Sequence, residues 1–390
     1  MKHVIVLGSG LVGSAIIKDL AHQGEFRVTA VDTDPRQLGK LPDKKNIDRL
    51  HGDIRDREFM NSLLSSGSLL VIAVPGHLGY QVLEQAVEQG NKVIDISFAP
   101  ENPLRLHDKA RAAGAQAIVD MGVAPGMSHV LAGCAARDMD EIHTLRILVG
   151  GLPRERIKPF EYKAGFSPVD VIEEYTRPAR LIVNGQIVRK EALSEVEPID
   201  IPPVGTLEAF NSDGLRTLLF TVKADNMVEK TLRYPGHAAL MKTLRDSGFF
   251  SERPLALEGG DVTPRSLTSA LLFHHWEMRP EDEDLTVMRV IALGKRDYRR
   301  VVFAASLFDE YDRQTNIHSM ARTTGYAATA ALRLLASGKI RRKGIIPPEE
   351  LGRNLNFSTF LMEDQASKGI HYNVTYEREE DWSTGECGQG

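Results

Sequence analysis

The stretch HVIVLGSGLVGSAIIKDLAHQG, residues 3–24, decides the fold class of this chain. Its apolar start, residues 3–8, is typical of a buried strand, and residues 11–24 have the pattern of a helix. The segment RVTAVDTD, residues 27–34, follows as a second strand and completes a βαβ unit. Three glycines in the Gly-x-Gly-x-x-Gly spacing stand at the turn from strand to helix: Gly8, Gly10 and Gly13. In this context the spacing predicts a dinucleotide-binding domain of the Rossmann type.

Each glycine of this loop has its own physical task. Gly8 permits the tight turn, Gly10 lets the backbone approach a pyrophosphate, and Gly13 lets the helix pack closely on the strand. The helix N-terminus adds a favourable field for the phosphate charge. We therefore expect the whole loop to contact the cofactor: Gly8, Ser9, Gly10, Leu11, Val12 and Gly13.

An acidic residue, Asp32, stands at the end of the second strand, where a carboxylate accepts hydrogen bonds from the adenosine ribose hydroxyls and repels a 2′-phosphate. Arg36 follows and is able to neutralise such a phosphate, but the carboxylate should dominate. The sequence thus predicts NAD as the cofactor and makes NADP the second choice. The alternatives are a Rossmann fold that binds another nucleotide or none.

Two further loops follow strands of the same predicted sheet and belong to the same crevice. Asp53, in HGDIRD (51–56), is placed to meet the adenine amino group, with a helix cap as the alternative role. The second loop, AVPGH (73–77), is expected to line the ribose through three residues: Ala73, Val74 and Pro75.

Strand and helix patterns continue to alternate up to residue 135. Further strands are predicted at 47–50, 68–74, 92–96 and 115–119, and helices at 56–66, 79–89 and 101–113. The fold class is therefore α/β, with a doubly wound parallel sheet of six strands in domain 1–135.

A second domain, residues 136–317, is predicted as a mixed α/β, largely antiparallel insertion that binds substrate and offers a surface for a homodimer. Residues 318–362 are predicted as helices that return to the first domain, and the polar tail, 363–390, as weakly ordered. Strands of the inserted domain are expected at 145–151, 180–188, 215–222, 285–293 and 298–308.

The composition bounds the class of protein. The chain has 390 residues, 42% hydrophobic and 26% charged, with a net charge of −5, which argues against capture of nucleic acid or of an anionic membrane. Its two cysteines, Cys134 and Cys387, exclude a disulfide framework, and no window has the length of a membrane span, so a cytoplasmic location is expected. The adjacent His274 and His275 point in different directions on a helix, so we predict no metal site.

Hydride transfer requires alignment with the nicotinamide and the handling of one substrate proton. Asp95 and Asp120 each follow a predicted parallel strand, where such sheets place ligands, and either can hold a cationic group of a substrate; a capping role is the alternative. Gly122 would let the backbone pass close to the nicotinamide, with a simple turn as the alternative. Tyr162 and Lys163 are further proton-transfer candidates, although a solvated lysine is the commoner case.

A polar cluster in LRYPGH contains Arg233 and His237. Arg233 is the candidate clamp for a substrate α-carboxylate, because a guanidinium matches carboxylate geometry. The alternative is an ion pair between the two domains.

Several segments, in order along the chain, resemble the saccharopine dehydrogenase-like family, with the greatest likeness to its lysine 6-dehydrogenase subgroup. They are VDMGVAPGMSHVLAG (119–133), VGGLP (149–153), FSPVDVIEEYTRPARLIVNG (166–185), LSEVEPI (193–199), GTLEAF (205–210), KTLRYPGH (230–237), SMARTTGYAA (319–328) and KGIIPPEE (343–350). The resemblance implies a Rossmann domain with an inserted substrate domain and NAD(P)-linked chemistry at a carbon–nitrogen bond of a small amino acid.

The subgroup implies oxidation of the L-lysine side-chain amine by NAD to an imine that hydrolyses to allysine. The chain departs from the subgroup at Arg177 and Arg216, two added cations that suit a substrate with an extra carboxylate. A saccharopine-type dehydrogenase or reductase acting on a secondary amine is therefore the alternative enzyme. A non-catalytic NAD-binding sensor is the alternative of another class.

Overall fold

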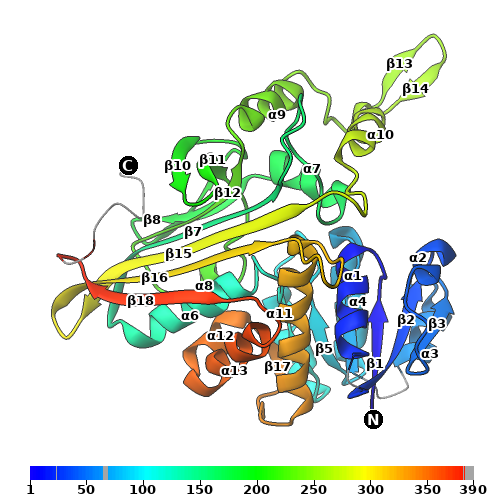
Figure 1. Ribbon diagram of the computed structural model, residues 1–390, viewed down its shortest axis with the longest axis horizontal. Coiled ribbons are helices and arrows are strands. Elements are labelled where there is room, and N and C mark those ends of the chain that lie inside the picture. Colours follow the sequence, from blue (N-terminus) through cyan, green and yellow to red (C-terminus); the bar gives the residue numbers. More distant parts are fainter. Residues whose placement is uncertain (23, 65–68, 381, 383–390) are drawn as a thin grey trace. The chain divides into compact units, whose positions relative to one another are not determined.

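The computed structural model describes residues 1–22, 24–64, 69–380 and 382. They form two compact units (Figure 1). The first unit comprises Met1–Arg137, Arg216–Thr221 and Met320–His371. The second unit comprises Asp138–Leu215, Val222–Ser319 and the described residues from Tyr372 onward.

The first unit is built on a seven-stranded sheet in the order β17-β6-β5-β4-β1-β2-β3, in which every neighbouring pair is parallel. The strands are β1 (Lys2–Leu7), β2 (Phe26–Asp32), β3 (Ile47–His51), β4 (Leu69–Ile72), β5 (Lys92–Asp95), β6 (Gln116–Ile118) and β17 (Gly344–Ile346). The inner strands β1, β4, β5 and β6 are mostly apolar and buried, as strands covered on both faces require, whereas the edge strand β3 has the exposed Arg49 at its centre. The predicted parallel α/β fold is confirmed.

The helices of the first unit are α1 (Leu11–Leu20), α2 (Pro35–Gly39), α3 (Arg57–Leu64), α4 (Gly76–Glu88), η1 (Pro103–Leu106), α5 (His107–Ala112), α6 (Met127–Asp138), α8 (Leu218–Thr221), α11 (Ser319–Ala336), α12 (Pro348–Arg353) and α13 (Leu355–Ala366). Helices α1 to α5 connect successive strands of the first unit and pack against its sheet, and the further helices of this unit come from later parts of the chain. None of the helices in the described ranges is long and apolar enough to cross a bilayer.

The second unit is built on a nine-stranded sheet, whose long strands β7, β15, β16 and β18 run side by side in Figure 1. All its pairs are antiparallel except β12 with β7, which is parallel. The strands are β7 (Glu141–Pro153), β8 (Ala179–Val183), β9 (Gln186–Lys190), β10 (Glu197–Ile201), β11 (Gly205–Asn211), β12 (Asn226–Arg233), β15 (Asp284–Arg296), β16 (Arg299–Glu310) and β18 (Tyr372–Arg378). The unit also contains the hairpin β13 (Leu255–Leu257) and β14 (Gly260–Val262), and the helices α7 (Pro168–Thr176), α9 (His237–Asp246) and α10 (Pro264–Trp276).

The strand predicted at 215–222 is wrong. The structure has the short helix α8 there, and Arg216–Thr221 belongs to the first unit, so it interrupts the inserted domain. The buried apolar residues of this stretch stand at helical spacing, which an alternation-based prediction overlooks: Leu215, Leu218, Leu219 and Val222.

The prediction of a weakly ordered tail from residue 363 is wrong for residues 363–378. Helix α13 continues to Ala366, and β18 pairs with β16 along seven residues. Most side chains of β18 are exposed, since it is an edge strand, and this exposure explains its polar composition. The rest of the tail from 383, with Cys387, lies outside the described residues.

Candidate active site

The glycine loop between β1 and α1 has the geometry expected of a dinucleotide-binding turn. Gly8 has a φ of +94°, and a Cβ there would lie 2.2 Å from the carbonyl oxygen of Ala73. A Cβ on Gly13 would lie 2.1 Å from the carbonyl oxygen of Gly8. A Cβ on Gly10 would meet no atom within 4 Å. Gly8 and Gly13 are thus required by packing, whereas Gly10 faces open space in which a pyrophosphate can be received.

This difference predicts opposite effects for two matched alanine variants. Gly10→Ala should fold normally, since its φ of −64° suits alanine, but should weaken NADH affinity by about tenfold or more, or ~1.4 kcal/mol. Gly13→Ala should lower the free energy of unfolding by about 1–3 kcal/mol through backbone overlap. Thermal unfolding and NADH fluorescence titration measure both effects. If the two variants lost the same NADH affinity and were equally stable, the distinct roles of Gly10 and Gly13 would be contradicted.

Asp32 lies at the end of β2 and is tied to the glycine loop. Its Oδ2 accepts hydrogen bonds from the Ser9 amide (2.7 Å) and the Ser9 hydroxyl (2.8 Å), and its Oδ1 accepts one from the Asp34 amide (2.9 Å). Arg36 pairs instead with Asp34, at 2.9 Å, and its side chain is largely exposed. The carboxylate of Asp32 is therefore held in a fixed orientation beside the predicted cofactor loop.

The two other predicted cofactor loops differ in their local roles. Asp53 accepts from the Arg55 amide (2.9 Å) and forms an ion pair with its guanidinium (2.6 Å). The cap of α3 is Asp56, whose Oδ1 accepts from the Glu58 amide at 2.9 Å, so the capping role does not fall to Asp53. The loop 73–75 lies directly beside the glycine turn, because the Ala73 carbonyl is the group that would collide with a Cβ on Gly8.

The first unit brings Asp120 and Arg216 together, 96 residues apart in the chain. Asp120 follows β6 with a φ of +52° and is 1% exposed. Its Oδ1 accepts from Nε and Nη2 of Arg216, at 3.1 and 2.9 Å, and Nη1 of Arg216 donates to the Ala99 carbonyl. Its Oδ2 is buried and has no hydrogen-bond partner among the residues that the structure describes. One buried carboxylate oxygen of Asp120 is thus left without a hydrogen-bond donor.

Asp95, at the end of the neighbouring strand β5, belongs to the same cluster. Its Oδ1 accepts from the amide (2.9 Å) and hydroxyl (2.6 Å) of Ser97. Burial raises the pKa of Asp95 to about 7; the charge of Asp120 adds to the increase, while Ser97 and Arg216 oppose it. The first unit therefore holds two adjacent buried carboxyl groups in different environments, as acid–base sites do.

The loop after Asp120 is a closed turn. The Gly122 amide donates to the Pro125 carbonyl (2.9 Å), and the Met127 amide donates to the Gly122 carbonyl (2.8 Å). Gly126 has a φ of +134°, and a Cβ there would lie 1.9 Å from the Gly122 carbonyl oxygen. The backbone packing of this loop therefore requires glycine at position 126. Helix α6 begins at the next residue, Met127.

One buried acid of the first unit escaped the sequence analysis. Glu349, in α12, is fully buried and accepts hydrogen bonds from the hydroxyls of Thr217 and Thr221. The segment that contains it, KGIIPPEE (343–350), is recognisable in the sequence only as one of the segments that carry the family resemblance. No local pattern distinguishes this buried glutamate from the partly buried Glu350 beside it.

The second unit holds a separate buried cluster around Arg233. Its Nη2 donates to Glu174 at 2.7 Å, and its guanidinium lies 4.5 Å from the ring centroid of Tyr162. His237 contacts the Tyr175 hydroxyl through Nε2 (2.8 Å), and burial with the charge of Arg233 lowers its pKa to about 3. The ion pair lies within the second unit, so the alternative of a pairing between the two domains is wrong. The guanidinium predicted as the clamp has Glu174 as a partner, while its buried Nε has no hydrogen-bond partner among the described residues.

The remaining predicted residues of the second unit also have internal partners. Nζ of Lys163 donates to the Glu277 carbonyl (2.9 Å) and lies 3.2 Å from Asp282. Arg177 lies 3.5 Å from Glu173, four residues before it on α7. These contacts do not favour Lys163 as the proton acceptor, because its ammonium group is held by acceptors.

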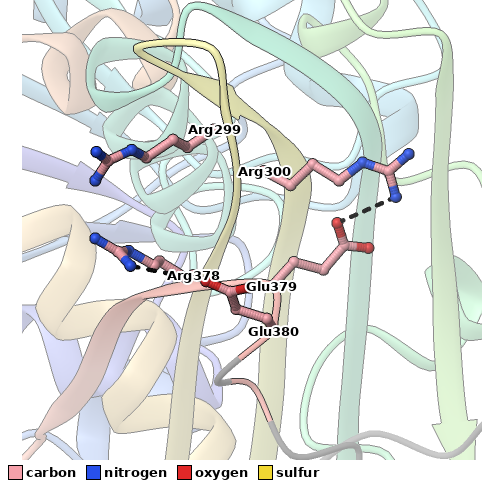
Figure 2. Close-up of a pocket in the computed structure, with 5 residues that line it drawn as sticks. All are labelled: Arg299, Arg300, Arg378, Glu379 and Glu380. Carbon is pink, nitrogen blue, oxygen red and sulfur yellow. Dashed lines mark ion pairs between the residues drawn. The ribbon is translucent and has the colours of Figure 1, made fainter.

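The surface depression shown in Figure 2 is not the predicted site. It is lined by Arg299, Arg300, Arg378, Glu379 and Glu380. Ion pairs join Arg300 to Glu379 (3.6 Å) and Arg378 to Glu380 (3.7 Å). No residue of the predicted cofactor or substrate site lines it. Within the described ranges, no group of three or more His, Cys, Asp or Glu side chains is arranged to hold a metal ion.

A parallel Rossmann sheet, a glycine turn with an acidic residue after the next strand, and a second mixed sheet define a dinucleotide-binding protein of two units. The chain belongs to the saccharopine dehydrogenase family: residues 4–118 match the Saccharopine dehydrogenase NADP binding domain, and residues 122–370 match the Saccharopine dehydrogenase C-terminal domain. The family resemblance predicted from the sequence is confirmed, and membership in the lysine 6-dehydrogenase subgroup stays a prediction.

Three curated relatives illustrate the breadth of the family. The mitochondrial alpha-aminoadipic semialdehyde synthase of Bos taurus is 28% identical over 67% of this chain and 30% of its own length. The saccharopine dehydrogenase [NADP(+), L-glutamate-forming] of Pyricularia oryzae is 25% identical over 64% of this chain and 58% of its own. Carboxynorspermidine synthase of Vibrio cholerae is 26% identical over 68% of this chain and 64% of its own. The matched region therefore spans less than two thirds of each relative.

One solved structure shares the fold of this protein over nearly the whole length of the chain. Apo saccharopine dehydrogenase (L-Glu forming) from Saccharomyces cerevisiae has a TM-score of 0.78, covering 96% of this chain and 100% of its own. At 18% identity, this match supports the fold alone.

Proposed function

We propose that this chain is an oxidoreductase that transfers hydride between a nicotinamide dinucleotide and the nitrogen-bearing carbon of an amino acid. The observation that carries the proposal is the buried, unpartnered Oδ2 of Asp120, located after a strand of the Rossmann sheet, where such sheets receive ligands. A buried carboxylate oxygen without a donor is poorly satisfied until a ligand supplies one. A substrate amine or ammonium group supplies such a donor.

The proposed substrate is L-lysine. A nicotinamide held at the glycine loop would supply the acceptor for a hydride from C6 of lysine, and one proton would leave the side-chain nitrogen. The resulting imine adds water and releases ammonium, which gives allysine. Asp120 is proposed to orient the nitrogen, and Asp95, with its pKa raised to about 7, is proposed to accept the proton.

The contacts of two arginines support lysine over a larger substrate. Arg177 and Arg216 were predicted to serve an additional substrate carboxylate, but they lie against Glu173 and Asp120 of the chain itself. Saccharopine remains the second candidate substrate, supported by the printed activity of the fungal relatives.

We further propose NAD as the cofactor, because the Ser9 contacts hold Asp32 where it would repel a 2′-phosphate. The relatives named for their cofactor use NADP(+), so this proposal separates the chain from them. Asp32→Asn should lower the ratio of kcat/KM with NAD to kcat/KM with NADP by about tenfold or more, since ~1.4 kcal/mol corresponds to tenfold. Asp48→Asn, which removes an exposed acid of β3 paired with Arg27, is the matched control. An unchanged ratio in Asp32→Asn would refute the assignment.

The proposed function is tested by following reduced nicotinamide formation at 340 nm with purified protein. L-Lysine and saccharopine are each offered with NAD and with NADP. We expect turnover with L-lysine and NAD. Turnover of saccharopine alone would replace lysine by the second candidate, and NADH binding without turnover of either amine would favour a non-catalytic sensor.

A further inference from the structure

The segment Arg216–Thr221 is a short excursion of the chain. It belongs to the first unit, whereas Leu215 before it and Val222 after it belong to the second. The segment starts at Arg216, with a φ of +47°, and contains only the four-residue helix α8. A helix of one turn has little stability of its own, so its position depends on tertiary contacts.

Glu349 supplies those contacts from α12. Its Oε2 accepts from the Thr217 hydroxyl at 3.0 Å, and its Oε1 accepts from the Thr221 hydroxyl. The two threonines are four residues apart and therefore lie on one face of the turn. Arg353, from the same helix as Glu349, donates to the Thr221 carbonyl at 2.6 Å. One helix thus binds both ends of the segment that follows Arg216.

Helix α12 is itself fixed on α6, the helix that begins after the Asp120 loop. A Cβ on Gly133 would lie 2.1 Å from the Glu349 carbonyl oxygen, and a Cβ on Gly352 would lie 1.9 Å from the Val130 carbonyl oxygen. Nδ1 of His129 lies 3.8 Å from Oε2 of Glu349. This close backbone packing gives Glu349 a fixed position relative to the start of α6.

A carboxylate is a costly group at this position. Burial raises the pKa of Glu349 to about 7, with the threonine hydroxyls opposing and the charge of Asp120 adding. An apolar side chain would fill the space without this cost. The two carboxylate oxygens of a glutamate accept hydrogen bonds from two hydroxyls at once, which an apolar side chain cannot do. This requirement explains why a glutamate occupies the position.

We infer that Glu349 is a positioning residue: by binding Thr217 and Thr221 it holds Arg216 against Oδ1 of Asp120 and so leaves Oδ2 directed to the substrate. This inference rests on the proposed function for its catalytic consequence only. The structural consequence, an ordered 216–221 segment, can be measured without a substrate.

Hydrogen exchange of the full chain tests the structural part. Thr217→Val and Glu349→Gln should each accelerate amide exchange in peptides covering 216–221 by about tenfold, since ~1.4 kcal/mol corresponds to tenfold. Thr329→Val is the matched control, because Thr329 is a buried threonine of the first unit that bonds the Tyr326 carbonyl of its own helix. Unchanged exchange in both test variants, or equal acceleration in the control, would overturn the inference.

A double-variant cycle tests the catalytic part. Thr217→Val should lower kcat/KM for the amine about tenfold in the wild-type background, or ~1.4 kcal/mol, and should have little effect in Arg216→Lys, since both act on one contact. If the double variant shows a loss of kcat/KM equal to the product of the two single losses, the positioning role is overturned. Wild-type protein inactive towards every amine would overturn the proposed function, while the exchange result would still decide the structural part.

Discussion

Asp120→Asn is expected to lower kcat/KM for the amine substrate by about 10²–10³-fold, which corresponds to ~3–4 kcal/mol of transition-state stabilisation at ~1.4 kcal/mol per tenfold. Two effects combine in this loss. The substrate nitrogen loses its charged acceptor, and the buried guanidinium of Arg216 loses its counter-charge. The affinity for NADH should stay near the wild-type value, because the glycine loop is bound to Asp32 whereas Asp120 is bound to Arg216. Steady-state kinetics and NADH titration measure the two quantities.

The control for this prediction is Asp19→Asn. Asp19 is another buried acid of the first unit, paired with Arg333 at 2.8 Å and with Lys368 at 3.2 Å. Its replacement should lower stability without a comparable loss of kcat/KM. Similar kinetic losses in the two variants would show that the Asp120 effect is structural and not due to substrate binding.

Asp95→Asn is expected to lower kcat by about 10²–10⁴-fold, the range typical of a positioned general base. In the wild type, kcat/KM should rise with pH and level off above about 7, because the raised pKa of Asp95 keeps the carboxyl protonated below that value. A protonated carboxyl cannot accept the amine proton. The asparagine variant should lose this inflection, as pH–rate profiles from pH 5.5 to 9 will measure.

Glu229→Gln provides a matched control for the pH profile. Glu229 is a buried acid of the second unit whose Oε2 accepts from Ser212 (2.7 Å), and burial raises its pKa to about 7 as well. The variant should keep the inflection, because Glu229 belongs to a different cluster. An inflection that persists in Asp95→Asn, or that disappears in Glu229→Gln, would contradict the assignment of the base.

Much of the first unit could be predicted from the sequence because its determinants are local. Buried parallel strands appear as apolar runs, and the turn at Gly8 requires a positive φ. Strand β17, Gly344–Ile346, was missed because it lies within 318–362, a range predicted as helices, and because its pairing with β6 joins segments far apart in the chain. Helix α8 was misread because its four residues lie in a stretch that also satisfies a strand pattern.

The site could be predicted only in part. Asp95 and Asp120 were found because the ends of parallel strands are marked in the sequence. The pairing of Asp120 with Arg216 is a tertiary contact between residues of distant segments, so Arg216 was assigned to the substrate instead. Glu349 was missed because its burial depends on the packing of α12 against α6 and on the segment 216–221.

The central claim is that hydride leaves the nitrogen-bearing side-chain carbon of the amino acid. The most direct test uses L-lysine in which both hydrogens of C6 are replaced by deuterium. The protein is incubated with this lysine and NAD, and the mass of the reduced cofactor is measured by mass spectrometry. The account predicts NADH that is one mass unit heavier than NADH formed from unlabelled lysine, together with a primary isotope effect on kcat/KM. Unlabelled NADH from the deuterated lysine would contradict the account, because the hydride would then come from another carbon.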